Sequence, residues 1–278
     1  MEFDYRDESC PHLKQKGDRF AFSFNCSSKG KVGGGSRICS VDIGLNHLAT
    51  MVILEEDGSI VKVGFFDLPE MMETFRKIIR EKNQLKSEGK DPASYYHYIT
   101  NFNREIAIRV ATAIVRFALQ YNAGTIIMEH LSKHGRIGQK RKNSEVISLW
   151  RPVDLRERVE NLAHRHLLSF STVSAFNTSK LAYDGSGKVE RNKENAAVCV
   201  FKNGRQFNTD LSAALNIGAR YLIRKLIENH KKQEEMLYEA IPDARNKNKR
   251  VWAHYIEMQN LFGIPTKAKI PEGKKKSR

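Results

Sequence analysis

The chain lacks the features of a secreted, zinc-stapled or membrane-spanning protein. Its 278 residues include only four cysteines, Cys10, Cys26, Cys39 and Cys199, and none forms a Cys-x-x-Cys pair. Neither a disulfide framework nor a zinc site is therefore indicated. No apolar run approaches the roughly 20 residues that a membrane span needs, and the acidic N-terminus at 1–8 is unlike a secretory signal. We expect a reducing cytoplasm and no membrane partner.

Acidic residues are also in the minority. Lys plus Arg number 47 against 32 for Asp plus Glu, which gives a formal net charge of +15 and a pI near 9.6. An excess of this size indicates a polyanionic partner, and nucleic acid is the default candidate. We therefore expect a DNA partner and a nucleoid-associated place within the cytoplasm. The alternative is a soluble protein that is simply basic.

A single carboxylate follows the first strongly apolar run. Residues 38–41 are mostly apolar and lead into Asp42, and Gly44 precedes a second β-rich run at 48–54. This pattern is typical of a buried strand that ends in an acid, a tight turn and an antiparallel return strand. Because an unpaired buried carboxylate is costly, Asp42 is expected to meet a cation, a metal ion or a hydrogen-bond donor. A satisfied structural aspartate is the alternative.

Hydrophobic periodicity predicts an α/β chain with two further isolated acids. Glu129 closes an apolar strand at 125–129, and Asp210 opens a helix at 209–228. The other expected strands are 37–43, 48–55, 60–66 and 170–176, and the other helices are 69–86, 94–121 and 153–168.

The three acids stand at the ends of elements that could converge in one mixed sheet. Two-metal nucleases need several carboxylates that hold a pair of divalent ions and clamp an in-line phosphoryl displacement. Carboxylates together with water and phosphate oxygens suit Mg²⁺ or Mn²⁺, and the shortage of histidine near these acids argues against zinc.

Four segments in matching order carry a resemblance to a known family. They are Asp42-Ile43-Gly44-Leu45 with Leu48-Ala49-Thr50, then Ile126-Ile127-Met128-Glu129-His130-Leu131, then Asn177-Thr178-Ser179-Lys180, and finally Asn208-Thr209-Asp210-Leu211-Ser212-Ala213-Ala214-Leu215-Asn216-Ile217. Together they resemble the RuvC-type nuclease of transposon-encoded OrfB/TnpB proteins, the relatives of type V CRISPR effectors. The resemblance spans residues 36–228.

The resemblance implies a metal-dependent endodeoxyribonuclease. It implies an α/β, ribonuclease-H-like (RuvC) mixed sheet flanked by helices, with Asp42, Glu129 and Asp210 as the catalytic residues that bind two Mg²⁺ or Mn²⁺ ions. It also implies DNA, a guide RNA and transposon-encoded proteins as partners. Basic residues expected to line the nucleic-acid groove are Arg104, Arg109, Arg116, Lys133, Arg136, Lys140, Arg141, Lys142 and Lys180. Taken one at a time, each could equally lie on a solvated charged face.

Two departures from the family shape the expected domains. The paired cysteines of the family's zinc ribbon are missing, so we predict a degenerate ribbon without zinc. Only residues 1–35 precede the nuclease core, which suggests a truncated or decayed copy, or a stand-alone nuclease module. The expected parts are a β-barrel remnant with linker (1–35), a core (36–176) with a helical insertion (69–121), the degenerate ribbon (177–208), the last core helix (209–228) and a basic, partly disordered tail (229–278).

Two rival functions remain open. One is a protein of the same fold without catalytic activity: an inactive or truncated nucleic-acid-binding protein associated with transposition. The other is an actin-like or sugar-kinase-like ATPase, because Asp184-Gly185-Ser186-Gly187 imitates a phosphate loop. That reading leaves Glu129 and Asp210 without a shared role.

Overall fold

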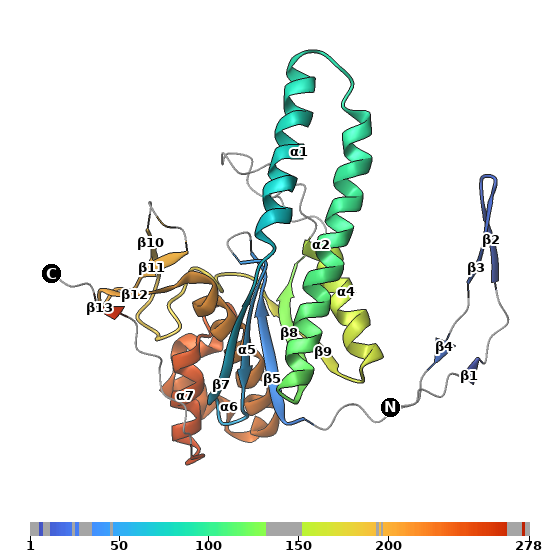
Figure 1. Cartoon of the computed structure of the whole chain (residues 1–278). Coiled ribbons are helices and arrows are strands. Elements are labelled where there is room, and N and C mark those ends of the chain that lie inside the picture. The colour runs from blue at the N-terminus through green and yellow to red at the C-terminus, as the bar shows by residue number, and fades with distance from the viewer. Residues whose placement is uncertain are drawn as a thin grey trace.

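A five-stranded mixed sheet forms the centre of the molecule (Figure 1). The computed structural model describes residues 6–7, 12–23, 26–27, 35–44, 47–131, 152–192, 195, 197–265 and 274–275. In spatial order the strands are β7 (Ile60–Phe66), β6 (Ala49–Leu54), β5 (Arg37–Asp42), β8 (Ala123–His130) and β9 (Ser169–Ser174). β5 pairs antiparallel with β6 and parallel with β8, and β8 pairs parallel with β9. All five predicted strands are confirmed.

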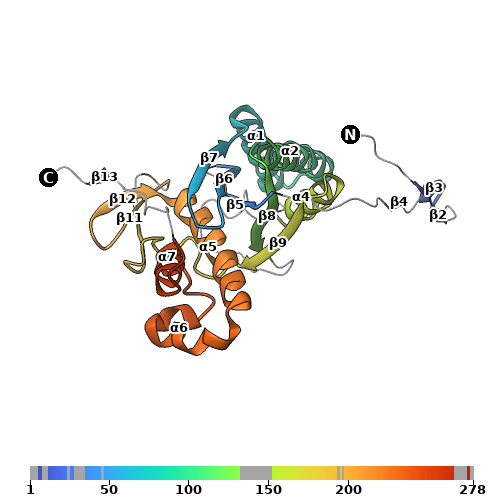
Figure 2. The same ribbon diagram turned by 90° about the horizontal axis from the view of Figure 1, so that it is seen from below.

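Both faces of the sheet are covered, which explains why β5 and β6 read as almost continuous apolar runs. Cys39, Val41 and Ile53 point to one face and belong to the core shared with the helical hairpin and α4. Ile38, Val52 and Leu54 point to the other face and pack in the core around α5. Figure 2 shows α1, α2 and α4 on one side of the sheet and α5, α6 and α7 on the other.

The first side is covered by three helices. They are α1 (Pro69–Ser87), α2 (Ala93–Gln120) and α4 (Pro152–Arg165). α1 begins at a proline, whose missing amide proton costs nothing at that position, and it buries Met72, Phe75, Ile78 and Ile79. α1 and α2 form the expected helical hairpin, and Figure 1 shows the hairpin rising beyond the sheet. No helix in the described part of the chain is long and apolar enough to cross a membrane.

The second side is dominated by α5 (Thr209–Asn229), which lies directly on β5. Gly218 permits this approach: a Cβ there would lie 2.5 Å from Leu54 Cδ1 and 3.1 Å from Ser40 Oγ. The Asn208 side chain caps the helix by accepting from the Leu211 amide at 2.8 Å. The N-terminus of α5 is thereby fixed over the sheet.

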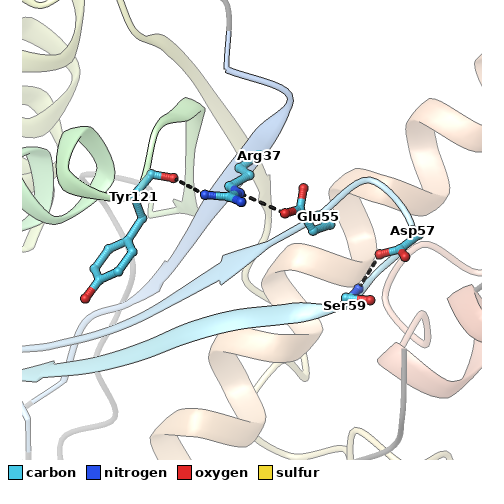
Figure 3. A network of polar contacts seen from close by, with 5 residues as sticks. All are labelled: Arg37, Glu55, Asp57, Ser59 and Tyr121. Atoms are coloured by element: carbon cyan, nitrogen blue, oxygen red, sulfur yellow. Dashed lines mark hydrogen bonds and ion pairs between the residues drawn. The ribbon is translucent and has the colours of Figure 1, made fainter. Parts of the chain in front are cut away.

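The starting end of β5 is joined to its neighbours by a polar network (Figure 3). Arg37 Nε donates to Glu55 Oε1 at 2.8 Å, and Arg37 Nη1 donates to the Tyr121 carbonyl at 3.1 Å. In the same hairpin turn the Ser59 amide donates to Asp57 Oδ1 at 2.8 Å. The network ties β5, the β6–β7 turn and the end of α2 together, at the sheet end opposite Asp42.

The ribbon segment is held by aromatic rings. β10 (Glu190–Arg191), β11 (Val198–Val200), β12 (Arg205–Asn208) and β13 (Lys274–Lys275) form a small sheet. The Tyr183 ring packs 4.6 Å from the Phe207 ring and 5.3 Å from the Phe201 ring, measured between centroids. Cys199 is buried, and its thiol donates to the Phe207 carbonyl. An apolar aromatic cluster therefore stabilises this segment.

Within the expected tail at 229–278, residues 231–261 are largely helical. That stretch forms η1 (Lys231–Gln233), α6 (Glu234–Ala240), η2 (Pro242–Arg245) and α7 (Trp252–Leu261). Leu237, Trp252, Tyr255 and Met258 are buried in the core around α5. The segment was hard to recognise because its helices are short and its apolar residues follow no sustained period.

The N-terminal residues that the structure describes form two small strand pairs. β1 (Arg6–Asp7) pairs with β4 (Cys26–Ser27), and β2 (His12–Lys16) pairs with β3 (Arg19–Ser23). None of these four strands joins the five-stranded sheet. Residues 28–34, within the expected β-barrel remnant and linker (1–35), lie outside the described residues.

Candidate active site

Asp42 is the last residue of the central strand. Because β5 is paired on both edges, its C-terminal end places the carboxylate in the middle of the sheet edge, where Asp42 is 9% exposed. The chain turns back at once: the Gly44 amide donates to the His47 carbonyl at 3.2 Å, and β6 begins at Ala49. The predicted strand, acid and tight return are confirmed.

Glu129 lies on the same face of the sheet as Asp42. Ser40 pairs with Ile127 in the parallel β5–β8 register, and Asp42 and Glu129 each follow two residues later. Since side chains alternate with a period of two, both acids point to the face that α5 covers.

Asp210 reaches this face from the first turn of α5. The positive end of the helix dipole favours a carboxylate at that position. The three acids, far apart in sequence, thus come from the central strand, its parallel neighbour and the helix that covers both.

The three carboxylates are close enough to repel one another. Burial raises the pKa of Asp42 well above its usual range, and the negative charges of Glu129 and Asp210 raise it further. Burial likewise raises the pKa of Glu129 and the pKa of Asp210. Clustered acids with raised pKa values are typical of functional sites, because a stable fold gains nothing from them alone.

Neighbouring groups fix two of these carboxylates. The Thr178 hydroxyl donates to Glu129 and, together with the charge of buried Arg220, counteracts the effect of burial on the pKa of Glu129. A hydrogen bond from the His47 backbone N–H and the electrostatic influence of the nearby His47 ring counteract the effect of burial on the pKa of Asp210. His47 is itself held by Asp67, whose Oδ2 lies 2.7 Å from His47 Nδ1.

The loop that carries Thr178 is anchored to α5. Asn216 is fully buried, and its Nδ2 donates to the carbonyls of Thr178 at 3.0 Å and Leu181 at 2.9 Å. Its Oδ1 accepts from the Trp252 amide at 3.4 Å. The amide side chain of Asn216 therefore joins α5, the Thr178 loop and α7.

The cluster fits a divalent cation in charge and donor type. Asp210 Oδ2 and Thr50 Oγ1 are buried without a hydrogen-bond partner, and Thr50 lies directly opposite Asp42 in the β5–β6 register. Carboxylate and hydroxyl oxygens are ligands that Mg²⁺ and Mn²⁺ accept. Among the residues that the structure describes, however, no three His, Cys, Asp or Glu side chains gather closely enough to hold one ion together. The acids converge on one face of the sheet, but their side chains are not close enough together to coordinate a single ion.

The expected basic residues are placed very differently from the acids. Lys180 is exposed, two residues beyond Thr178. Arg104, Arg109 and Arg116 are exposed on α2, which covers the opposite face of the sheet. Lys133, Arg136, Lys140, Arg141 and Lys142 lie outside the described residues.

Arg116 is the farthest of the α2 arginines from the acids. It lies four residues before the end of α2, roughly 6 Å along the helix axis, and β8 starts from that same end. Glu129 lies six residues into β8, roughly 20 Å along the strand. The structure therefore does not bring Arg116 to the acid cluster.

Sequence reasoning missed Arg191. This exposed β10 residue lies near enough to lower the pKa of Asp42 and the pKa of Asp210, and its Nη2 donates to Ser179 Oγ at 3.2 Å. No motif marks it, because its proximity depends on how the ribbon packs beside the sheet. Thr50 was missed as an individual residue for a similar reason: only the strand register reveals that it faces Asp42.

The segment 184–187, which resembles a phosphate loop in sequence, is a turn stabilised by its own hydrogen bonds. The Gly185 amide donates to the Ala182 carbonyl at 3.2 Å, and the Ser186 amide donates to Asp184 Oδ1 at 3.0 Å. Amides engaged in this way do not form a phosphate cradle. The geometry therefore gives the ATPase alternative no support.

Comparison with known proteins points to the same family as the motifs. No protein-family model matches the chain. The chain is 22% identical over 196 residues to the TnpB-like protein ORF457 of Acidianus two-tailed virus, a match that covers 66% of this chain and 41% of that protein.

A solved structure with a TM-score above 0.5 shows the fold. A Cas12f1–sgRNA–target DNA complex matches with a TM-score of 0.52 and 17% identity, covering 75% of this chain and 64% of that one. A CRISPR-Cas12f ternary complex matches with a TM-score of 0.49 and 15% identity, covering 74% of this chain and 44% of that one. The chain therefore has a RuvC-type mixed α/β fold, and the TnpB-like description of the viral relative agrees with the family that the motifs resemble.

Proposed function

We propose that the chain is an Mg²⁺- or Mn²⁺-dependent DNA endonuclease of the TnpB-like, RNA-guided type. Asp42, Glu129 and Asp210 are its proposed catalytic and metal-binding residues. The observation that carries this proposal is the convergence of buried Asp42 with the partly buried Glu129 and Asp210, from β5, β8 and α5, at one sheet edge. The negative charges of Glu129 and Asp210 both disfavour the charged form of Asp42.

Hydrogen bonds from neighbouring residues orient the carboxylates that would bind a cation. Thr178 orients Glu129, and the backbone of His47 orients Asp210 while leaving Asp210 Oδ2 without a protein partner. A pair of divalent ions, when bound, would neutralise the scissile phosphate and favour attack by water. Because raised pKa values oppose ionisation, cation binding should release protons and strengthen as the pH rises.

A nucleic-acid substrate is supported by the charge of the chain and by its relatives. The formal net charge is +15, exposed Arg191 lies near Asp42 and Asp210, and exposed Lys180 follows Thr178 by two residues. Arginine near a carboxylate cluster can bind a phosphate group in a bidentate manner. The Cas12f1 structure contains a guide RNA and target DNA, so we extend both partners to this chain as part of the proposal. A cytoplasmic, nucleoid-associated location and transposon-encoded partners belong to the same proposal.

The direct test is cleavage of labelled DNA with Mg²⁺ or Mn²⁺, with and without added RNA. We expect wild-type protein to cut and the variants Asp42→Asn, Glu129→Gln and Asp210→Asn each to lose at least 100-fold in rate, because each removes a proposed metal ligand. Glu239→Gln, an exposed carboxylate in α6, is the matched control and should cut normally. Cutting that survives in Asp42→Asn or persists in chelator would contradict the assignment.

The catalytically inactive nucleic-acid-binding protein is the second candidate. It is favoured by one observation, the lack of a closed metal-holding group among the described residues. This candidate predicts salt-sensitive DNA binding that is equal in wild type and Asp42→Asn, together with no metal-dependent cutting. The same cleavage assay, run beside a binding assay, separates the two candidates.

A further inference from the structure

Two large aromatic side chains are exposed at the same edge of the sheet as the acids. Phe176 is 61% exposed and Phe65 is 47% exposed. Exposed phenylalanine is costly in water, and each of these rings stands at the C-terminal end of a strand that runs parallel to β5. Phe65 is the penultimate residue of β7, and Phe176 lies two residues beyond the end of β9.

Strand register places Phe65 on the acid face. Asp42 pairs with Thr50, and Thr50 pairs with Phe65, so the three residues form a lateral row across β5, β6 and β7. Directly paired residues in antiparallel strands point to the same face. The His47 ring lies 4.7 Å from the Phe65 ring, and the backbone of the same histidine binds Asp210. His47 therefore contacts both the Phe65 ring and the Asp210 carboxylate.

Phe176 has the corresponding position on the other flank. Glu129 pairs with Val173, and Phe176 follows in the turn after β9, two residues before Thr178. The Thr178 hydroxyl donates to Glu129, so this ring is also linked to an acid through one short segment. Asn177, between them, has a φ of +65°, which turns the chain sharply at this point.

The spacing of the two rings suits a polynucleotide. Four strand-to-strand steps separate β7 from β9, which corresponds to roughly 19 Å at about 4.8 Å per step. At a rise of about 3.4 Å per nucleotide that distance holds about six nucleotides of helical strand, and fewer when the strand is stretched. The acids lie between the rings, and the cations of Arg191 and Lys180 are available to its phosphates.

We propose that Phe65 and Phe176 are base-stacking platforms that hold unpaired nucleobases on both sides of the Asp42, Glu129 and Asp210 cluster. The inference rests on the proposed function and adds a positioning device to it. An exposed ring stacks on the face of any base, but bases inside a duplex already have both faces covered. The platforms thus select a single strand with separated bases and draw one phosphate to the acids.

The test measures binding of the full chain in chelator, so that cleavage plays no part. Fluorescence anisotropy compares a labelled single-stranded oligodeoxynucleotide with an abasic strand of the same length and charge. We expect wild type to prefer the strand with bases. Phe65→Ala and Phe176→Ala should each lose about 5- to 150-fold in Kd for that strand and keep the affinity for the abasic one. Phe176→Trp should retain the preference.

Controls separate stacking from folding and from the nuclease proposal. Phe176→Leu keeps an apolar side chain without a ring and should behave as Phe176→Ala at an unchanged Tm. Tyr98→Ala, an exposed aromatic on α2, should bind as wild type. Equal binding of both strands by wild type, or full base preference in both alanine variants, would overturn the platforms. Because binding is measured without metal, the two proposals can fail independently. Base preference without cleavage would support the platforms and contradict the nuclease, and cleavage without base preference would do the reverse.

Discussion

The hydroxyl of Thr178 donates to the carboxylate of Glu129, so the turn after β9 orients an acid on β8. The same hydroxyl lies 3.0 Å from the Ala175 carbonyl, and its single proton can serve only one acceptor at a time. The charge on Glu129 therefore decides which bond forms. Loop geometry and the ionisation state of the site are coupled at this hydroxyl.

Thr178→Val should shift the pH dependence of cleavage. Donation by Thr178 lowers the pKa of Glu129 against the larger effect of burial, so removing the hydroxyl should raise the pKa of Glu129 further. The acid limb of the rate profile then moves to higher pH, and the rate at pH 7 falls about 10-fold, as expected for losing a hydrogen bond to a charged group. Initial rates between pH 5 and 9 provide the measurement. Thr178→Ser should keep the wild-type profile, and an unshifted limb in the valine variant would contradict the assigned role.

Asp42→Asn should stabilise the fold at neutral pH. The pKa of Asp42 is raised in the folded state, so its contribution to stability is complete below its unfolded pKa and is lost as the pH rises through the folded pKa. A neutral amide avoids that loss. We expect Tm in chelator at pH 7 to rise by ~2–4 °C, the effect of ~1 kcal/mol in a domain of similar size. The difference should vanish near pH 4, and Glu239→Gln should show none at either pH.

Asn216→Ala should loosen the Thr178 loop. The change leaves the carbonyls of Thr178 and Leu181 without their buried donor and should cost about 2–4 kcal/mol in the free energy of unfolding. Urea denaturation followed by circular dichroism measures this loss. Asn101→Ala, at an exposed position on α2, is the control and should change stability by less than about 0.5 kcal/mol. Equal stability of the two variants would show that the loop does not depend on Asn216.

Trp252→Ala should show that residues 231–261 belong to the core. Trp252 is fully buried beside α5, and emptying such a site costs about 3–5 kcal/mol. Leu261→Ala lies in the same helix at 48% exposure and should be nearly neutral. Both are measured by urea denaturation. A wild-type midpoint for Trp252→Ala would mean that α7 does not contribute to stability.

Gly218→Ala should test how closely α5 approaches the sheet. The added methyl group meets Leu54 and Ser40, and overpacking of this kind costs about 1–3 kcal/mol. Shortening Leu54 to alanine should relieve part of the conflict. The double variant should therefore be more stable than the sum of the two single losses predicts. Strictly additive losses in thermal unfolding would argue against direct contact.

Local sequence signals were enough to predict the three acids and the elements that carry them. Asp42 and Glu129 each end an apolar strand, and Asp210 stands behind an Asn208 cap, so every one of them has a signature within a few residues. The sequence indicated only that these elements could converge in one mixed sheet, and the family resemblance supplied the expectation of a shared site. The site-residue roles remain predictions until cleavage is measured.

Tertiary placement accounts for what the sequence did not reveal. Positive charge on α2 is plain in the sequence, but only the fold shows that Arg116 lies near the end of the sheet opposite Glu129. Arg191 approaches the acids because β10 pairs with β11, a two-residue contact with no sequence signal. The short helices after α5 have charged neighbours that conceal their apolar pattern, although Trp252 itself is readily interpreted as a packing residue from the sequence.

The position of Asp210 in α5 also sets when the acid cluster can exist during synthesis. β5 and β8 can pair as soon as the intervening hairpin has been made, but the third acid is supplied by a helix that follows them in the chain and must dock on a finished sheet. Contacts between such distant segments form late in folding. A nascent chain therefore carries an incomplete acid cluster until α5 has emerged and packed, and the proposed cleavage activity would be delayed until then.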